Sequence, residues 1–400
     1  MALITESLIT STDNKIVLLV LDGLGGLPQH PGGPTELEAA TTPNLDKLAR
    51  DGVLGLLDPI GPGITPGSGP AHLSLFGYDA VEHNVGRGLL SALGGDFPLE
   101  DRDVCARGNF CTLDSSGNVT DRRAGRIATE LSTPLCEKLE NEIQIEGVEI
   151  FIRPEKDHRF LLVIRGEHLS DQLEDTDSQK TGIPPLKCKP LREEAARTAK
   201  AVDEFTDKAR RVLVGEKKAN GVLLRGFAKR LPLPTMSDRF GLRAAALADY
   251  PMYRGLARLV GMEVLSKDPD LKVRFAEVKR LRNDFDFFFV HYKKTDAAGE
   301  DGDFEKKVKV IEELDVALPA LLDAKPDVLI VTGDHSTPAT MASHSWHPVP
   351  VLIHGNNVRT DDTTAFGETQ AAHGGLGRIP MMYLLPIALA HAGRLQKFGA

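Results

Sequence analysis

Short runs of aliphatic residues, each ending on acidic or glycine residues, recur near both ends of the chain. Residues 16–21 and 328–331 are wholly aliphatic, a pattern that predicts strands buried on both faces of a parallel sheet. Residues 285–290 form a third, mostly aromatic run. Because open α/β sheets bind ligands at the carboxyl ends of their strands, the polar residues after these runs are candidates for a functional site.

Helical patterns lie between these predicted strands. Residues 41–52 begin with Thr42 as a helix cap and Pro43 at the first helical position, and they end on a glycine. Residues 305–322 repeat apolar side chains at helical spacing. Residues 380–391 are mainly apolar and predict a closing helix. Strands that alternate with helices in this way predict an α/β fold with a mostly parallel sheet.

A glycine- and proline-rich loop lies between two apolar segments. Seven of the ten residues in 61–70 are Gly or Pro, so this backbone is shaped for something other than packing. Ser68 stands near its end, between two glycines. In such loops a serine is commonly a turn residue, but it can also be a nucleophile that a metal ion activates. The acidic and histidine residues elsewhere in the chain favour the nucleophile.

Metal-ligand residue types follow the predicted strands. The candidates are Asp22, Ser68, Asp296, Glu300, Asp334, His335 and His344. A single Asp in such a position commonly caps a turn, but the adjacent pair Asp334 and His335 can both face one ion. Carboxylate and imidazole together suit Mn²⁺, Zn²⁺, Co²⁺ or Mg²⁺. Seven ligands are enough for two ions, which is the arrangement that supports in-line phosphoryl transfer.

Between residues 92 and 284 the chain consists of short predicted strands and helices, with arginines at turns and strand ends. These arginines are Arg107, Arg122, Arg123, Arg126, Arg153, Arg159, Arg225 and Arg243. Guanidinium groups bind phosphate and carboxylate in bidentate fashion, so the set suits a small, doubly anionic ligand. The alternative is that several of them form surface ion pairs. Residues 172–190 are polar, contain Gly and Pro, and predict a loop.

Composition narrows the class of protein. A chain of 400 residues predicts two domains, and 41% apolar residues are enough to bury both cores. The formal net charge of -9 argues against a general nucleic-acid-binding protein. We find no signal-peptide pattern and no apolar stretch as long as a membrane span. The four cysteines lack CxxC spacing, so we expect a cytoplasmic protein with unpaired cysteines.

A series of motifs along nearly the whole chain resembles those of the cofactor-independent phosphoglycerate mutases of the archaeal type, within the alkaline phosphatase superfamily. The motifs, in order, are LVLDGLGG, ATTPNLDKLARDG, PGSGPAHLSLFGYD, ARGNF, DRRAGRI, VHYKKTD, AGEDGDFEKKVKVIEELD, TGDHSTP and HSWHPVPVLI. The resemblance implies an alkaline-phosphatase-like α/β core built from residues 1–91 and 285–400. Residues 92–284 would then form an inserted α/β or α+β domain that binds substrate.

The resemblance also implies roles for the candidate residues. Ser68 would be transiently phosphorylated. One metal ion would be held by Asp22, Ser68, Asp334 and His335, and the other by Asp296, Glu300 and His344. The substrate would be bound by Arg123, Arg126, Arg159, Arg225 and Arg243. The implied cofactors are two divalent cations, with Mn²⁺ favoured over Mg²⁺, Co²⁺ or Zn²⁺, and 2,3-bisphosphoglycerate is not required.

Two positions depart from the family pattern. Glu300 stands where the family has a histidine, four residues after Asp296. A carboxylate there would shift the preference of the site toward hard cations such as Mn²⁺ or Mg²⁺. Arg243 stands where a lysine is expected, and a guanidinium fork is not equivalent to a compact ammonium group.

These observations predict an enzyme that interconverts 2-phosphoglycerate and 3-phosphoglycerate, a step of glycolysis and gluconeogenesis, through a phosphoserine at a metal-bound serine. A related phosphomutase, or a phosphatase acting on another small phosphorylated acid, is the alternative with the same fold. A non-catalytic metal-binding sensor is the alternative from another class. No nucleic-acid or membrane partner is predicted, and the oligomeric state stays open.

Overall fold

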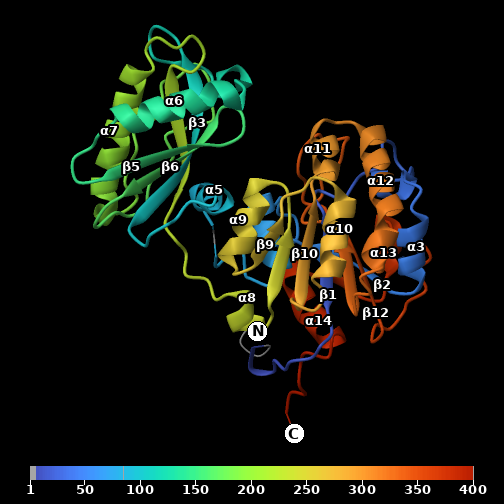
Figure 1. Ribbon diagram of the computed structural model, residues 1–400. Helices are drawn as coiled ribbons and strands as arrows, with labels where there is room; N and C mark the ends of the chain where they lie inside the picture. The colour runs from blue at the N-terminus through green and yellow to red at the C-terminus, as the bar shows by residue number, and fades with distance from the viewer. Residues whose placement is uncertain (1–5, 84, 400) are drawn as a thin grey trace. The chain divides into compact units, whose positions relative to one another are not determined.

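The computed structural model describes residues 6–83 and 85–399 of the chain. The chain forms two compact units (Figure 1). The core unit comprises Met1–Asn84 and Leu233–Ala400, and the inserted unit comprises Val85–Pro232. The predicted boundaries at 92 and 284 differ from these, because the segment after Pro232 contributes strands and helices to the core unit.

The core unit is built around an eight-stranded sheet. Its strands, in spatial order, are β13 (Gly377–Pro380), β2 (Val53–Asp58), β12 (Val349–Gly355), β11 (Val328–Thr332), β1 (Ile16–Leu21), β10 (Phe287–Tyr292), β8 (Ala244–Leu247) and β9 (Glu263–Ser266). β12 runs antiparallel to both of its neighbours, and the other pairs are parallel. The predicted α/β fold with a mostly parallel sheet is therefore confirmed.

The central strands are buried along their whole length because helices cover both faces of the sheet. Every residue of β1, β10 and β11 is buried. Alternate residues of β1, Val17, Leu19 and Leu21, join one hydrophobic cluster with side chains of α3, α10 and α12. Figure 1 shows α10 and α12 beside each other over this face. The helices of the core unit are α2 (Glu36–Ala39), α3 (Pro43–Arg50), α4 (Ser68–Leu75), α8 (Met236–Phe240), α9 (Pro251–Leu259), α10 (Leu271–Arg280), α11 (Lys294–Glu300), α12 (Phe304–Leu322), α13 (Glu368–His373) and α14 (Leu384–His391).

The three helices expected from local patterns are present with small differences at their ends. α3 begins at Pro43, as predicted, but the Thr42 hydroxyl donates to Asp46 and does not cap the helix. α12 begins at Phe304, one residue before the predicted start. The closing segment begins as a 3₁₀ turn, Met381–Tyr383, before α14.

β8 and β9 explain the difference in the domain boundary. β8 pairs in parallel with β10. Its sequence is mostly alanine, a residue that is depleted in strands, so the hydrophobic pattern did not predict a strand there. Arg243 directly precedes β8 and donates from Nε and Nη2 to the two carboxylate oxygens of Asp286, at 3.1 and 3.2 Å. Asp286 directly precedes β10, so this pair lies at the amino edge of the sheet. Arg243 is therefore far along the strands from their carboxyl ends, and its predicted role in substrate binding is not supported.

The inserted unit is an antiparallel sheet with two helices on one face. Its elements are α5 (Arg87–Gly94), β3 (Asp103–Leu113), β4 (Val119–Asp121), α6 (Thr129–Glu142), β5 (Glu149–Pro154), β6 (Arg159–Arg165), α7 (Ala196–Val212) and β7 (Gly221–Ala228), with 3₁₀ turns at Ala124–Arg126 and Glu193–Ala195. The pairs that β3 makes with β4, β6 and β7, and that β5 makes with β6, are all antiparallel. Side chains of α6 and α7 pack in one hydrophobic cluster with the sheet.

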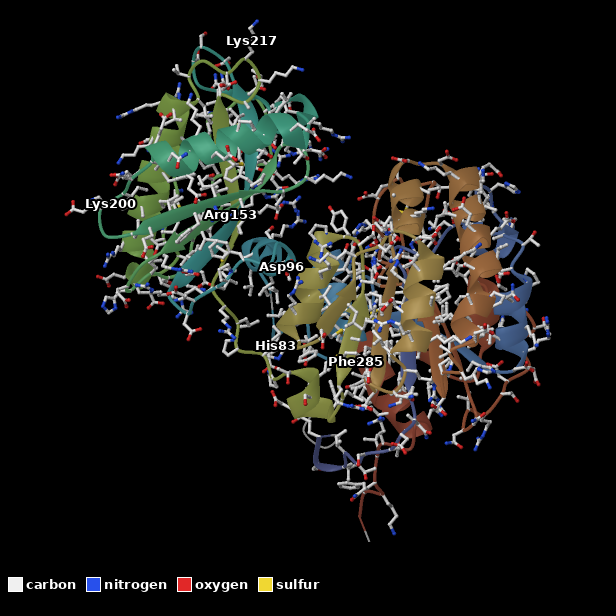
Figure 2. All side chains as sticks on the ribbon, viewed as in Figure 1. His83, Asp96, Arg153, Lys200, Lys217 and Phe285 are labelled. Atoms are coloured by element: carbon white, nitrogen blue, oxygen red, sulfur yellow. The ribbon has the colours of Figure 1, made fainter. Side chains whose placement is uncertain are left out.

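Charged side chains cover the outside of the inserted unit, where Figure 2 shows Arg153, Lys200 and Lys217. Arg153 pairs there with Glu140, so the surface ion pair that was the alternative reading holds for this arginine. All four cysteines are buried and unpaired, as expected. Among the described helices, none is long and apolar enough to cross a membrane.

Candidate metal centre and basic pocket

The core sheet brings four of the predicted ligands together at its carboxyl edge. Asp22 directly follows β1, and Asp334 and His335 follow β11 after a single glycine. Asp296 lies in the first turn of α11, shortly after β10. β1 is in register with β10 and β11 on its two sides, so the three strands end at the same level. All four side chains are fully buried.

Ser68 is presented to these ligands by the first turn of α4. The preceding Gly67 is extended, with φ -87° and ψ 156°, and the helix begins at Ser68. Ser68 Oγ lies 3.1 Å from His335 Nε2. One turn later, His72 Nδ1 lies 2.9 Å from the Ser68 carbonyl oxygen and holds this turn in place. A helix N-terminus stabilises negative charge, so the position suits a serine that carries a phosphoryl group.

Asp22, Asp334 and His335 form the first ligand group, with one atom from each within 4.8 Å of the others. His335 Nε2 lies 3.4 Å from Asp22 Oδ1 and 3.2 Å from Asp334 Oδ2. Neither of these two oxygens makes a hydrogen bond of good geometry among the described residues, and the nitrogen nearest Asp334 Oδ2 besides that of His335 is His72 Nδ1, at 3.2 Å. Buried carboxylate oxygens without donors are costly unless a cation neutralises them. The donor set therefore fits a divalent metal ion.

The other oxygens of the two carboxylates are held by the protein. Asp22 Oδ2 accepts from the Tyr253 hydroxyl and lies 3.2 Å from His291 Nε2 and 3.1 Å from Lys293 Nζ. Asp334 Oδ1 accepts from the backbone N–H of Gly23 at 3.0 Å. Burial alone would raise the pKa of Asp22, but Lys293 and His291 hold it well below its ordinary value. Asp22 is thus ionised, with one oxygen fixed and the other directed at the ligand group.

Tyr253, His291 and Lys293 were not recognised from the sequence. Lys293 and His291 belong to the VHYKKTD motif, and their position at the end of a buried strand is the signal that could have marked them. Tyr253 comes from α9, in the segment that was assigned to the insertion. Donors in this position orient metal ligands and affect metal affinity about 10- to 100-fold.

Asp296, His335 and His344 form the second ligand group. His344 Nε2 lies 3.6 Å from Asp296 Oδ1. His344 Nδ1 lies 3.0 Å from the carbonyl oxygen of Pro66, which can only accept, so Nδ1 carries the proton and Nε2 is free to bind a metal. The imidazole rings of His344 and His335 stack with their centroids 3.7 Å apart. The two ligand groups are therefore adjacent and share His335.

Glu300 lies at the rim of the second group. Its side chain is 55% exposed, and its Oε1 lies 3.9 Å from His344 Nε2. It belongs to neither of the two compact groups found among the described residues. Its role as a ligand stays a prediction, since a short movement of an exposed side chain at the end of α11 would bring the carboxylate to an ion.

We expect Glu300→His to shift the metal preference toward Co²⁺ and Zn²⁺, because an imidazole nitrogen is a softer ligand than a carboxylate oxygen. Glu300→Ala should weaken one of two bound ions by about tenfold or more, as for loss of a supporting metal contact. Metal titrations of the purified variants measure both effects. Glu305→Ala, on the neighbouring helix α12, is the matched control. Equal affinities and equal metal rankings in all variants would show that Glu300 is no ligand.

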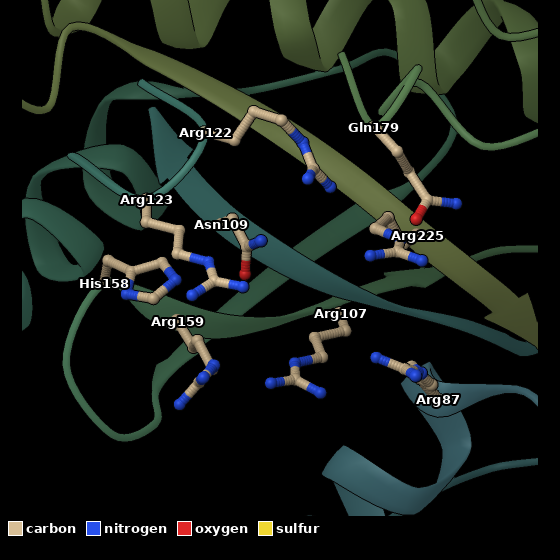
Figure 3. A pocket seen from close by; sticks show the side chains of 9 residues that line it. All are labelled: Arg87, Arg107, Asn109, Arg122, Arg123, His158, Arg159, Gln179 and Arg225. Carbon is tan, nitrogen blue, oxygen red and sulfur yellow. The ribbon is translucent and has the colours of Figure 1, made fainter. Parts of the chain in front are cut away.

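A pocket in the inserted unit gathers basic side chains on the sheet face away from α6 and α7 (Figure 3). Its lining consists of Arg87, Arg107, Asn109, Arg122, Arg123, His158, Arg159, Gln179 and Arg225. Arg107 on β3 stands directly opposite Arg225 on β7. Like charges opposite each other on neighbouring strands are destabilising. Such a concentration of cations is typical of a site for a small anion.

Carboxylates lie near at least four of these arginines, and those near Arg107 and Arg159 are each 3.9 Å away. Arg122 donates to both oxygens of Asp177, at 2.9 and 2.6 Å, and Arg225 Nε lies 3.8 Å from the same side chain. Burial, with Arg159 and Arg123 nearby, lowers the pKa of His158 to about 4. His158 is therefore neutral at pH 7, and the positive charge of the pocket comes from its arginines.

Three of the five predicted substrate-binding arginines, Arg123, Arg159 and Arg225, line this pocket. Arg126 does not belong to the lining, because the chain turns through left-handed residues at Ala124, Gly125 and Arg126. Arg243 belongs to the core unit, as described above. Four lining residues were not recognised from the sequence: Arg87, Asn109, His158 and Gln179. The alternation of β3, which puts Arg107 and Asn109 on one face, was the available signal.

Comparisons with known proteins find a family model and relatives that share one description. A family model described as "2,3-bisphosphoglycerate-independent phosphoglycerate mutase" matches residues 49–218. A probable 2,3-bisphosphoglycerate-independent phosphoglycerate mutase of Thermus thermophilus is 51% identical over 401 residues and covers 99% of both chains. A relative with the same description from Thermotoga maritima is 49% identical over 396 residues, covering 99% of this chain and 98% of its own.

Two solved structures are similar over nearly the whole chain. The PH0037 protein from Pyrococcus horikoshii has a TM-score of 0.83 at 32% identity, covering 97% of this chain and 99% of its own. The cofactor-independent phosphoglycerate mutase from Thermoplasma acidophilum has a TM-score of 0.72 at 29% identity, covering 95% and 100%. The similarity therefore includes both units and both candidate sites.

Proposed function

The chain belongs to the 2,3-bisphosphoglycerate-independent phosphoglycerate mutases, and we propose that it interconverts 2-phosphoglycerate and 3-phosphoglycerate through a phosphoserine formed on Ser68. The observation that carries this proposal is the position of Ser68 Oγ, 3.1 Å from His335 Nε2, because the same nitrogen lies 3.4 Å from Asp22 Oδ1 and 3.2 Å from Asp334 Oδ2. A phosphoryl group held on the protein itself makes 2,3-bisphosphoglycerate unnecessary.

Two divalent cations are the cofactors that these residues suit. Asp22, Ser68, Asp334 and His335 would hold one, and Asp296 and His344, with Glu300 at the rim, would hold the other. Divalent cations at such sites supply Lewis acidity to the attacking and leaving oxygens of a phosphoryl transfer. Mn²⁺ is the favoured ion, because carboxylate oxygens outnumber imidazole nitrogens among these ligands.

Ser68 would act as the nucleophile. Ser68 loses its hydroxyl proton as its oxygen attacks the phosphorus of the substrate, the bond from phosphorus to the glycerate oxygen breaks, and that glycerate oxygen takes up a proton. The other hydroxyl of the same glycerate then loses its proton and attacks the phosphoserine, the bond from phosphorus to Ser68 Oγ breaks, and Oγ takes up a proton, which regenerates Ser68. The N-terminus of α4 stabilises the negative charge of the phosphoserine between the two steps.

The basic pocket of the inserted unit is proposed to bind the carboxylate and phosphate groups of phosphoglycerate. Arg123, Arg159 and Arg107 provide guanidinium groups that match both anions in bidentate geometry. Retaining the glycerate between the two transfers is what separates a mutase from a phosphatase, because a released glycerate would leave the phosphoserine to water.

The test is an assay of the purified protein with 3-phosphoglycerate and Mn²⁺, without 2,3-bisphosphoglycerate, followed by ³¹P NMR. We expect 2-phosphoglycerate to form until equilibrium, with little inorganic phosphate. Rapid release of inorganic phosphate without 2-phosphoglycerate would identify a phosphatase instead. No turnover with any divalent cation, in a protein that still binds metal, would leave the sensor as the better description.

A further inference from the structure

The side chain of Thr337 contacts Asp296, which belongs to the second ligand group, and His335, which the two groups share. Thr337 follows His335 by two residues in the TGDHSTP motif, and it is fully buried. Its Oγ1 lies 2.7 Å from Asp296 Oδ1 and 3.0 Å from His335 Nδ1. No role has been given to this hydroxyl in the reaction described above.

The number of protons determines the direction of both hydrogen bonds. A hydroxyl has a single proton to donate, and a carboxylate oxygen can only accept. The other oxygen of Asp296 accepts from the Lys293 ammonium group, as expected for an ionised carboxylate. Thr337 therefore donates to Asp296, and it must accept from His335, so that Nδ1 carries the proton of this imidazole ring.

This tautomer leaves a lone pair on His335 Nε2. Nε2 faces Asp22 Oδ1 at 3.4 Å and Asp334 Oδ2 at 3.2 Å. The opposite tautomer would direct a proton at these oxygens, form a hydrogen bond with them and close the ligand group to a cation. A metal-binding imidazole usually has its second nitrogen fixed by an acceptor in this way.

We propose that Thr337 is a positioning residue that couples the two metal sites, because one hydroxyl selects the metal-binding tautomer of His335 and also orients Asp296. The inference rests on the proposed function, since it assumes that both ligand groups bind divalent cations. It adds a group that touches neither substrate nor metal but sets the geometry of both sites together.

The surrounding structure leaves Thr337 little freedom to move. Its backbone N–H donates to the carbonyl oxygen of Gly25 at 3.0 Å, and its own carbonyl accepts from the buried Lys307 ammonium at 2.9 Å. A Cβ on Gly23 would come within 2.5 Å of Thr337 Oγ1, and a Cβ on Gly299 within 2.2 Å of the Thr337 carbonyl oxygen. Glycine at both positions allows this close approach, so the hydroxyl is held in one place.

Thr337→Val removes the hydroxyl and keeps the branched shape, whereas Thr337→Ser keeps the hydroxyl. Thr332→Val is the matched control, because Thr332 is equally buried but donates to the carbonyl oxygen of Pro350, which is not a ligand. We expect Thr337→Val to weaken the binding of both Mn²⁺ ions by about 10- to 100-fold in equilibrium titrations. Thr337→Ser should restore most of the affinity, and Thr332→Val should leave it unchanged.

A second readout does not require metal or activity. In the ¹⁵N NMR spectrum of the metal-free protein at pH 9, where histidine is neutral, His335 should have its proton on Nδ1 in the wild type and in Thr337→Ser. In Thr337→Val it should shift toward the Nε2 tautomer. A wild-type ring protonated on Nε2 would overturn the proposal, and this measurement stands even if Thr337→Val does not fold.

The outcomes separate this inference from the proposed function. If the wild type binds two ions and turns over phosphoglycerate but Thr337→Val binds both ions normally, only the coupling by Thr337 is wrong. If Thr337→Val weakens one ion and not the other, the hydroxyl orients a single ligand and the coupling is again wrong. If the wild type forms no phosphoserine, the proposed function fails whatever the tautomer of His335.

Discussion

Replacing Ser68 with alanine is expected to lower mutase turnover by about four orders of magnitude or more, as for loss of a nucleophile that acts as one unit with its neighbours. The fold should persist, because the Gly- and Pro-rich loop and the first turn of α4 are shaped by the backbone and by His72, not by the Ser68 hydroxyl. Assays of 3-phosphoglycerate conversion, with thermal unfolding as the measure of stability, test both parts.

The phosphoserine itself gives an independent measurement. Acid quenching of the wild type during turnover, followed by peptide mass spectrometry, should detect phosphate on Ser68, and the Ser68→Ala protein should carry none. Ser74→Ala is the control, because Ser74 is a buried serine on the same helix but is not among the candidate ligands. Wild-type turnover by Ser68→Ala would mean that the nucleophile is another residue.

Local patterns were sufficient for the centre of the core sheet and for the ligands attached to it. β1, β10 and β11 are buried and mainly apolar, and Asp22, Asp296 and Asp334 follow them within a few residues. A parallel sheet aligns the carboxyl ends of its strands, so residues hundreds of positions apart could be placed together without a structure. The same patterns did not predict β8, because its sequence is mostly alanine, which is not typical of strands.

Residues that act through contacts across the fold were beyond the reach of local patterns. Tyr253 reaches Asp22 from a helix that lies 231 positions away in the chain. Asp177 orients Arg122 from residues 172–190, whose composition predicted a loop but no contact with Arg122. Arg243 illustrates the reverse case. Its guanidinium pairs with Asp286 at the amino edge of the sheet, and the sequence beside a strand does not show at which edge an arginine lies. Patterns give residue types and spacing, but the direction of a side chain depends on its distant neighbours.

The basic pocket could not be predicted from local sequence patterns either. Period-2 alternation in β3 puts Arg107 and Asn109 on one face, and β6 and β7 add Arg159 and Arg225 through pairing registers that depend on the whole sheet. Arg123 enters from a turn with left-handed residues, which no hydrophobic pattern reveals. Only the pairing register brings these separate arginines into one pocket.

Removal of divalent cations should abolish turnover, and Mn²⁺ or Co²⁺ should restore it, whereas addition of 2,3-bisphosphoglycerate should have no effect. Asp22 and Asp334 are buried carboxylates whose ligand atoms lie within 4.8 Å of each other, and two buried anions this close are unfavourable unless a cation neutralises them. Each ion bound at a free concentration 100 times its Kd should therefore stabilise the fold by about 2.7 kcal/mol. Calorimetric unfolding with and without Mn²⁺ measures this gain, and Asp334→Asn should lose most of it. Undiminished turnover after exhaustive chelation would contradict the two-metal model, even if the stability of the protein did respond to Mn²⁺.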